Sequence, residues 1–196
     1  MDTAEQNQDI SKETVEGAST ARQRERTKIE FPYTDLGQAE ELTRTLFQQG
    51  GGTAEPAQLA GWMDQSPNGG TYRARLSAAR MFGFIETARG SVSIMPLGKD
   101  VLDDNKRGAA RVIAYLRVPL FAEMYDQLNG YVLPPSAAIE RMVNELGVPV
   151  KQKERARQVF QKSASIAQFI DPGSGRFVKP SVNNIEDSSH KAPKPK

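Results

Sequence analysis

The 196-residue chain contains no cysteine, one histidine and one tryptophan. The missing cysteine excludes a disulfide framework, a thiolate metal site and a cysteine nucleophile. The single histidine, His190, lies in a terminal segment poor in core-forming residues, where nothing would orient it for acid–base catalysis. No apolar run approaches the roughly 20 residues of a membrane-spanning helix, and the acidic, polar N-terminus does not resemble a secretory signal. We therefore expect a cytoplasmic protein with no membrane association.

Groups that would support catalysis or cofactor binding are scarce. Asp103 and Asp104 are adjacent at a predicted helix entrance, where carboxylates commonly complement the helix N-terminus. Residues 50–52 lack the lysine and hydroxyl of a phosphate loop, and residues 173–175 lack the strand–helix context of a dinucleotide fingerprint. The sequence thus predicts a non-enzymatic protein that uses no metal and no cofactor.

Charge and apolar residues are unevenly spread along the chain. The net charge is +2, whereas residues 31–180 by themselves carry +3. The two ends, residues 1–28 and 181–196, offer little to bury and are predicted to be disordered tails. Between them, residues 31–103 and 107–180 each have the length of a small module.

The first module is predicted to open with a long helix and a short one. Thr34 and Asp35 can cap the long helix, with Gln38 at the capping-box position, and residues 50–52 end it. Its inner face follows helical spacing, and Glu40 and Arg44 are expected to pair outside; the inner residues are Leu36, Ala39, Thr43, Leu46 and Phe47. Pro56 opens the short helix, for which the expected packing residues are Leu59, Ala60, Met63 and Trp62.

A third helix and a hairpin follow. Thr71 is predicted to cap this helix, which runs to about Phe82 and ends at Gly83 in the left-handed conformation. Residues 84–86 and 92–95 are strand-like and are joined by a glycine turn. Helix, short helix, turn, helix and hairpin in this order is the winged helix-turn-helix arrangement. A mainly α fold with small β-hairpin wings is therefore expected.

Residues 107–180 are predicted to repeat this pattern. The helical segments are residues 109–128, with a break near Pro119, residues 135–146, and residues 151–168. The octapeptides 79–86 and 164–171 match in apolar pattern, and each is followed by a glycine turn, a strand and a proline. We therefore expect Phe169 and Ile170 to pair with Phe177 and Val178, and two winged helix-turn-helix modules to stand in tandem.

Three segments of the first module, residues 58–60, 76–85 and 97–99, resemble winged-helix proteins of the prokaryotic transcription-regulator type. The run of leucine, alanine and Gly-Phe-Ile resembles a recognition helix that leads into the wing. The resemblance covers residues 31–102 well and residues 109–180 loosely. Its motifs are patterns of size and polarity, which indicate the fold and leave the function open.

The third helix carries the best candidate for nucleic-acid contact. At about 100° per residue, Arg73, Ser77 and Arg80 share one outward arc, and guanidinium groups bond guanine edges or phosphates. The helix start, with Thr71, would favour a phosphate, and Arg89 at the hairpin tip could reach the minor groove or the backbone. Arg75 points toward the apolar arc and is expected to be structural. The plainer alternative is that these arginines only solvate the helix.

The helix predicted for residues 151–168 is a weaker candidate for nucleic-acid contact. Glutamine can recognise adenine, whereas a central glutamate opposes phosphates. The expected outward residues are Glu154, Gln158, Gln161 and Ser165, with Lys151, Arg155, Arg157 and Lys162 at the margins. The nucleic-acid contacts predicted in this module are Lys151, Arg155, Gln158 and Lys162, and contact with protein instead of DNA stays open.

Two classes of function follow. The first is a double-stranded-DNA-binding regulator of transcription or of the genome; the alternative is a protein–protein adaptor or dimerising module, including a homo-oligomer, on the same fold. A positive stripe joining the third helix, Arg89 and the helix from Lys151 to Lys162 would favour DNA. An exposed apolar patch would favour the adaptor, and its expected members are Tyr115, Leu120, Phe121 and Tyr131. The predicted core is Leu36, Leu46, Leu59, Leu76, Phe82, Ile85, Phe160, Ile166 and Phe169.

Overall fold

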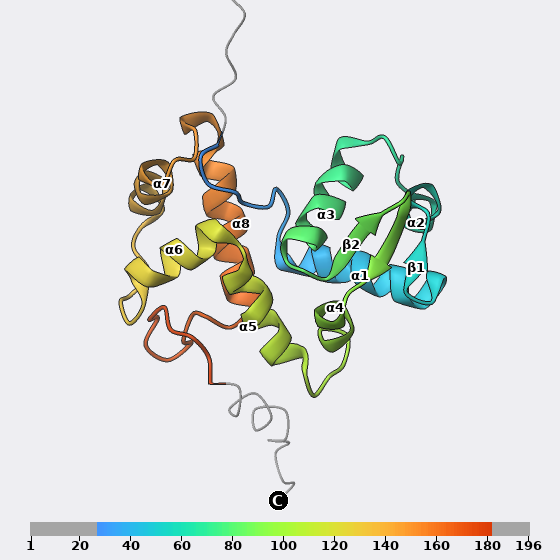
Figure 1. The fold of residues 1–196 in the computed structure, drawn as a ribbon. Helices are drawn as coiled ribbons and strands as arrows, with labels where there is room; N and C mark the ends of the chain where they lie inside the picture. Colours follow the sequence, from blue (N-terminus) through green and yellow to red (C-terminus); the bar gives the residue numbers. More distant parts are fainter. Residues whose placement is uncertain (1–26, 182–196) are drawn as a thin grey trace, which may run out of the picture.

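A computed structural model describes residues 27–181, and most of both predicted tails lies outside this range. The described chain forms two lobes, one holding a small sheet and the other built mainly from helices (Figure 1). The helices are α1 (Leu36–Gly50), α2 (Pro56–Trp62), α3 (Gly70–Met81), α4 (Pro96–Asp100), α5 (Arg107–Arg117), α6 (Pro119–Leu128), α7 (Ser136–Glu145) and α8 (Lys153–Ile166), and the strands are β1 (Thr53–Ala54), β2 (Ile85–Ala88) and β3 (Ser91–Ile94). The mainly helical fold with a small antiparallel sheet is as predicted. Over residues 27–181, no helix is long and apolar enough to cross a membrane.

Helix α1 is bounded by the signals that the sequence contains. The Asp35 carboxylate accepts a hydrogen bond from the Gln38 N–H at 3.2 Å, which satisfies a donor of the first turn. At the other end Gly51 has a φ of +60°, in the left-handed region where glycine meets no Cβ penalty. Both ends of α1 therefore agree with the prediction.

The buried face of α1 is wider and differently placed than predicted. Its buried members include Leu36, Ala39, Leu42, Thr43 and Leu46, whereas Phe47 is 50% exposed. Glu40 is only 5% exposed and pairs with Arg111 of α5. The predicted outward pair of Glu40 and Arg44 is wrong, because a helix from the second half of the chain covers this part of α1.

Helix α2 connects α1 to α3. Leu59 and Ala60 are buried as predicted, but Trp62 is 40% exposed and its ring lies against Gly50, where a Cβ would come within 3.0 Å of it. The buried Tyr72 of α3 donates its hydroxyl hydrogen to the Pro56 carbonyl oxygen at 2.7 Å. This bond fixes the start of α3 on the start of α2.

Helix α3 begins earlier than predicted and ends as predicted. Gly69 is its N-cap, and Thr71 lies inside the first turn with an exposed side chain, so the assignment of Thr71 as the cap is wrong. A turn precedes the helix, in which the Gly69 N–H donates to the Ser66 carbonyl at 2.9 Å. This turn positions Gly69 as the N-cap. At the far end Gly83 has a φ of +81°, and the Phe84 N–H donates to the Ala79 carbonyl at 2.9 Å.

A three-stranded antiparallel sheet in the order β1-β3-β2 closes the first lobe. Strands β2 and β3 form the predicted hairpin, with Ile85 opposite Ile94 and Ala88 opposite Ser91. Strand β1 was not predicted; it places Thr53 and Ala54 along the other edge of β3. A segment of two residues shows no periodicity of apolar residues in the sequence. It is a strand only because it pairs with the edge of β3.

The second lobe confirms the predicted helical segments. The break near Pro119 separates α5 from α6, and Gly147, with a φ of +100°, follows α7. The ring of Tyr115 lies at the centre of an aromatic cluster, with centroid distances of 4.4 Å to Phe169 and 4.8 Å to Phe121. Offset aromatic contacts of this kind add to the stability that burial of the rings provides.

A reduced hairpin follows α8. Ile170 and Phe177 form an isolated antiparallel bridge, and the Val178 N–H donates to the Phe169 carbonyl at 2.8 Å, so the predicted backbone pairing is present. The pairing is too short to make a strand in this part of the described chain. Val132, between α6 and α7, bridges Arg176 on the other side.

One hydrophobic cluster runs through both lobes. The predicted core residues that are buried are Leu36, Leu46, Leu59, Phe82, Ile85, Phe160 and Phe169. Leu76 and Ile166 are partly buried and pack against this cluster, so they lie at its edge rather than at its centre. Leu76 borders the exposed side of α3, and Ile166 packs at the lobe boundary, where its Cδ1 would lie 3.1 Å from a Cβ at Gly37.

Residues 27–35, which we call the strap, run along the second lobe before α1 begins (Figure 1). The Lys28 N–H donates to the Gly147 carbonyl at 3.0 Å, and the Leu120 N–H donates to the Glu30 carbonyl at 3.3 Å. Phe31 is 4% exposed. Thr27 and Lys28, which the sequence assigned to the tail, therefore belong to the strap; the rest of the predicted tails, residues 1–26 and 182–196, lies outside the described residues.

Candidate nucleic-acid interface

The outward face of α3 carries three of the predicted contact residues. Arg73, Ser77 and Arg80 are exposed, while Tyr72 and Ala79 on the opposite side are buried. Arg73 donates from Nη2 to the Asn68 Oδ1 at 3.1 Å, which ties it to the turn before the helix. Within residues 27–181, Ser77 and Arg80 have no side-chain hydrogen bond or ion pair. We call Arg73, Ser77 and Arg80 the α3 strip.

Arg75 turns in the opposite direction, as the helical wheel predicts. Its Nη1 lies 3.5 Å from the Glu41 Oε2 of α1, and only 19% of its side chain is exposed. Its Nε is buried and has no hydrogen-bond partner among the described residues. Two arginines two residues apart on one helix, Arg73 and Arg75, therefore differ in environment, which defines how α3 is rotated against the rest of the lobe.

Thr71 is exposed but does not join the α3 strip. At about 100° per residue, Thr71 lies on the opposite side of α3 from Arg80. It stands in the first turn, where backbone N–H groups have no acceptor within the helix. An anion bound at the helix start would lie near Thr71.

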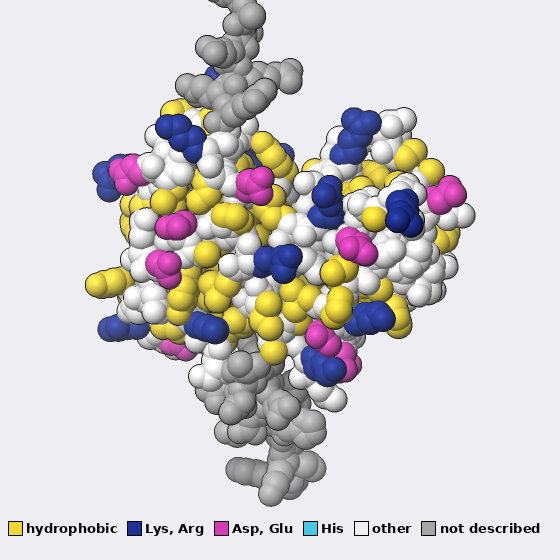
Figure 2. Space-filling view, viewed as in Figure 1, with side chains coloured by type: hydrophobic (Ala, Val, Ile, Leu, Met, Phe, Trp, Pro, Cys, Tyr) yellow, Lys and Arg dark blue, Asp and Glu magenta, His cyan; other side chains and the backbone are white. Residues whose placement is uncertain are grey.

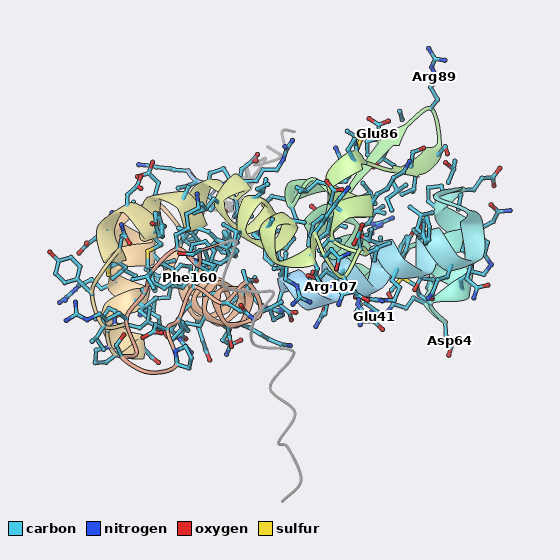
Figure 3. The ribbon with its side chains drawn as sticks, turned by 90° about the horizontal axis from the view of Figure 1, so that it is seen from below. Glu41, Asp64, Glu86, Arg89, Arg107 and Phe160 are labelled. Atoms are coloured by element: carbon cyan, nitrogen blue, oxygen red, sulfur yellow. The ribbon has the colours of Figure 1, made fainter. Side chains whose placement is uncertain are left out.

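Arg89 stands at the tip of the β2–β3 hairpin and projects away from the body of the molecule (Figure 3). Arg89 and Gly90 have φ values of +51° and +79°, the two positive values of a tight two-residue turn. A side chain in the left-handed region costs on the order of 1 kcal/mol relative to glycine. The hairpin nevertheless holds an exposed guanidinium group at this position, with the exposed carboxylate of Glu86 further down β2.

The residues predicted from the second module lie mostly against the strap. Arg155 donates from Nη1 to the Tyr33 carbonyl oxygen at 3.1 Å, and Lys162 Nζ lies 2.9 Å from the Asp35 carboxylate. Gln158 donates to Glu154 on the same helix at 3.1 Å. These residues line a shallow pocket of about 180 Å³ beside the strap. Arg155 and Lys162 thus hold the start of α1 onto α8. Lys151 is exposed in the 3-10 turn Val150–Gln152 that precedes α8.

The basic and acidic residues are distributed unequally. Residues 106–181 contain twelve lysines and arginines and six carboxylates, whereas residues 27–105 contain seven and ten. Within the first half, the segment 70–95 is an exception, with four arginines and one carboxylate. Figure 2 shows basic side chains over the lobe of α3 and the hairpin and at the centre of the same face, separated by other residues rather than joined in a stripe.

The apolar patch expected for an adaptor is not formed. Tyr115, Leu120 and Phe121 are 0% exposed, because they build the core of the second lobe. Only Tyr131 is exposed, at 69%.

A larger pocket, about 300 Å³ in volume, lies between the start of α5 and the end of α8. Its two guanidinium groups already face carboxylates: Arg107 pairs with Asp104, and Arg111 pairs with Glu40. Both arginines therefore serve the packing of the described chain.

The exposed Arg117 was not among the contact residues that the sequence predicted. Arg117, the last residue of α5, lies over Gly83 at the end of α3, where a Cβ would come within 2.9 Å of its Cδ and Nε. A single arginine in a helical turn gives no pattern in the sequence, so only the packing of α5 against the end of α3 reveals it.

Comparison with protein-family models, characterised proteins and solved structures gives no match to this chain.

Proposed function

We propose that residues 31–103 form a winged helix-turn-helix module that binds double-stranded DNA, and that the protein is a non-enzymatic regulator. The observation that carries the proposal is the rotation of α3, which presents the α3 strip outward while Arg75 pairs with Glu41. The element order α1-β1-α2-α3-β2-β3 and the sheet order β1-β3-β2 support it, because a winged helix-turn-helix module has this order of helices and wing hairpin.

In this proposal α3 enters the major groove. A helix of 12 residues is about 18 Å long, enough to follow the groove with its exposed side. Arg73 and Arg80 then bond guanine edges or phosphates, and Ser77 between them contacts a base or a phosphate. Arg89 at the hairpin tip reaches the adjacent backbone or minor groove.

We further infer that residues 107–180 are a reduced copy of the same module. The end of α8 supports this inference: Gln168 has a φ of +60°, and the Phe169 N–H donates to the Ala164 carbonyl at 2.9 Å. This matches Gly83, Phe84 and Ala79 at a spacing of 85 residues. The isolated bridges place the segment of Arg176 and Phe177 between Val132 and Ile170. Strand β3 lies between β1 and β2 in the same way. In this copy α8, the helix equivalent to α3, holds the strap, so we assign α8 a supporting role.

The test is binding of the full chain to mixed duplex DNA across a salt series, with Arg80→Ala and Arg75→Ala compared. Arg80→Ala should weaken binding by roughly 1–3 kcal/mol if it reads a base edge. If it contacts only phosphate, the loss should be the same on every sequence and the salt slope should flatten by about one unit. Arg75→Ala should leave binding unchanged and lower stability, because it removes a contact between α3 and α1.

The two variants form an internal control, since each removes one positive charge from the same helix. Equal losses of affinity would mean general electrostatic attraction without a docked helix. A parent protein that does not bind DNA even at low salt would overturn the proposal in favour of the adaptor.

A further inference from the structure

Arg117 connects the second half of the chain to the end of α3. It is the last residue of α5, and α6 begins at Pro119 after the single residue Val118. Gly83 permits the contact: the Arg117 Cδ and Nε would lie 2.9 Å from a Cβ there, and Cζ 3.2 Å. Any side chain at residue 83 would displace the guanidinium group.

The Arg117 guanidinium has no acidic partner within residues 27–181, and its side chain is exposed. Two other cations of the second half pair with carboxylates: Arg111 with Glu40, and Lys162 with Asp35. Arg80 stands in the last turn of α3, and its carbonyl accepts the Gly83 N–H at 3.0 Å. Arg117 therefore lies over the glycine that ends α3, three residues after Arg80.

Arg117 and the exposed Arg80, which stands in the last turn of α3, have no carboxylate partner among the described residues, and an anion would offset their positive charge. Figure 2 shows basic side chains over α3 and at the centre of the same face. A guanidinium group matches the oxygens of a phosphate through its planar set of N–H donors. The chemistry of the junction thus fits a phosphodiester of the duplex whose groove α3 would enter.

We infer that Arg117 extends the DNA-contacting face of α3 across the lobe boundary by binding a backbone phosphate, an inference that rests on the proposed function. The second half then contributes to DNA binding through the end of α5. Helix α8 does not serve this role, because its cations Arg155 and Lys162 hold the strap and the start of α1. The bound duplex lies across both lobes.

The alternative role for Arg117 is to stabilise the fold. Cations near a helix C-terminus offset the partial negative charge of its last carbonyls, and the ends of α3 and α5 meet at this junction. Such a role would affect the melting temperature and leave the dependence of DNA binding on salt unchanged.

The experiment uses the full chain and fluorescent duplexes of two unrelated sequences between about 50 and 200 mM salt. Arg117→Gln removes the charge, Arg117→Lys keeps it, and Arg141→Gln removes an exposed charge from α7, far from α3 (Figure 1). Losing one phosphate contact flattens the salt slope by about 0.9, so the ratio of parent to Arg117→Gln affinity should fall about 3.5-fold across this range. The loss should be equal on both sequences, Arg117→Lys should keep the parent slope, and Arg141→Gln should match the parent.

The inference is overturned if the parent binds in an Arg80-dependent way while Arg117→Gln keeps the parent affinity and slope. It is also overturned if Arg117→Gln lowers only the melting temperature, which would assign Arg117 to the helix ends. A parent protein that binds neither duplex at low salt removes the proposed function, and this inference with it.

Discussion

Glu40 of α1 and Arg111 of α5 form a two-pronged ion pair between the two lobes. The Arg111 Nε lies 2.7 Å from Oε1 of Glu40, and Nη2 lies 2.7 Å from Oε2. Only 6% of the Glu40 side chain is exposed, against 27% of Arg111. Both carboxylate oxygens are thereby satisfied, and α1, against which α3 packs, is fixed relative to the second lobe.

Removing one partner of this pair should destabilise the protein strongly. Arg111→Met leaves the buried Glu40 carboxylate without its cation, and the free energy of unfolding should fall by about 3 kcal/mol. The double variant Glu40→Gln/Arg111→Met should recover most of this loss, because no buried charge remains. Urea denaturation measures all four members of the cycle, with Arg141→Met as an exposed control. Additive effects of the two single changes would contradict the coupling.

Substitution of Arg89 by glycine should weaken DNA binding without lowering the stability of the protein. Glycine adopts positive φ without a Cβ penalty, so Arg89→Gly should keep or slightly raise the melting temperature of the protein. The same change removes the guanidinium group from the hairpin tip and should weaken binding to duplex DNA. Arg89→Lys keeps the charge and should retain most of the affinity. If Arg89→Gly binds DNA as the parent does, the hairpin tip does not touch the duplex.

Two leucines of the first lobe should respond differently to truncation. Leu59 is 0% exposed, so Leu59→Ala should cost on the order of 2–5 kcal/mol of stability. Leu76, which the sequence placed in the core, is only partly buried, and Leu76→Ala should cost less. Thermal melts of the two variants give the order directly. A larger loss for Leu76→Ala would mean that α3 is rotated differently from the arrangement described.

The contact between α7 and α8 should weaken in acid. A hydrogen bond from Arg157, together with the nearby Lys153, lowers the pKa of Glu140 below its usual value, against the opposing effect of burial. A carboxyl with a lowered pKa in the folded state contributes stability above its unfolded pKa of about 4.5, and this stability is lost as the pH falls through the folded value.

Glu140→Gln should therefore melt below the parent at neutral pH, and the two melting temperatures should converge as the pH falls well below 4.5. A difference that stays constant over the whole pH range would show that ionisation of Glu140 is not involved. The isosteric amide keeps the size of the side chain, so packing is not disturbed.

The sequence by itself determined most of the helices, both ends of α1, the C-terminal end of α3 and the rotation of α3. These features depend on neighbours in the chain: Asp35 caps α1, Gly83 ends α3, and the spacing of Tyr72 and Ala79 against Arg73 and Arg80 defines a buried and an exposed side. A local signal of this kind acts through backbone dihedral angles and a period of 3.6 residues, both of which can be read from the printed sequence.

Tertiary structure alone decided which charged groups find partners and where strand β1 forms. Glu40 was predicted to face outward but pairs with Arg111 of α5, and Arg155 and Lys162, which are predicted DNA contacts, also bond to the strap. Strand β1 exists only because β3 lies beside it. In each case the deciding partner is tens of residues away, and the free energy of a charged or backbone polar group depends on what replaces its water, so no local pattern could have fixed the outcome.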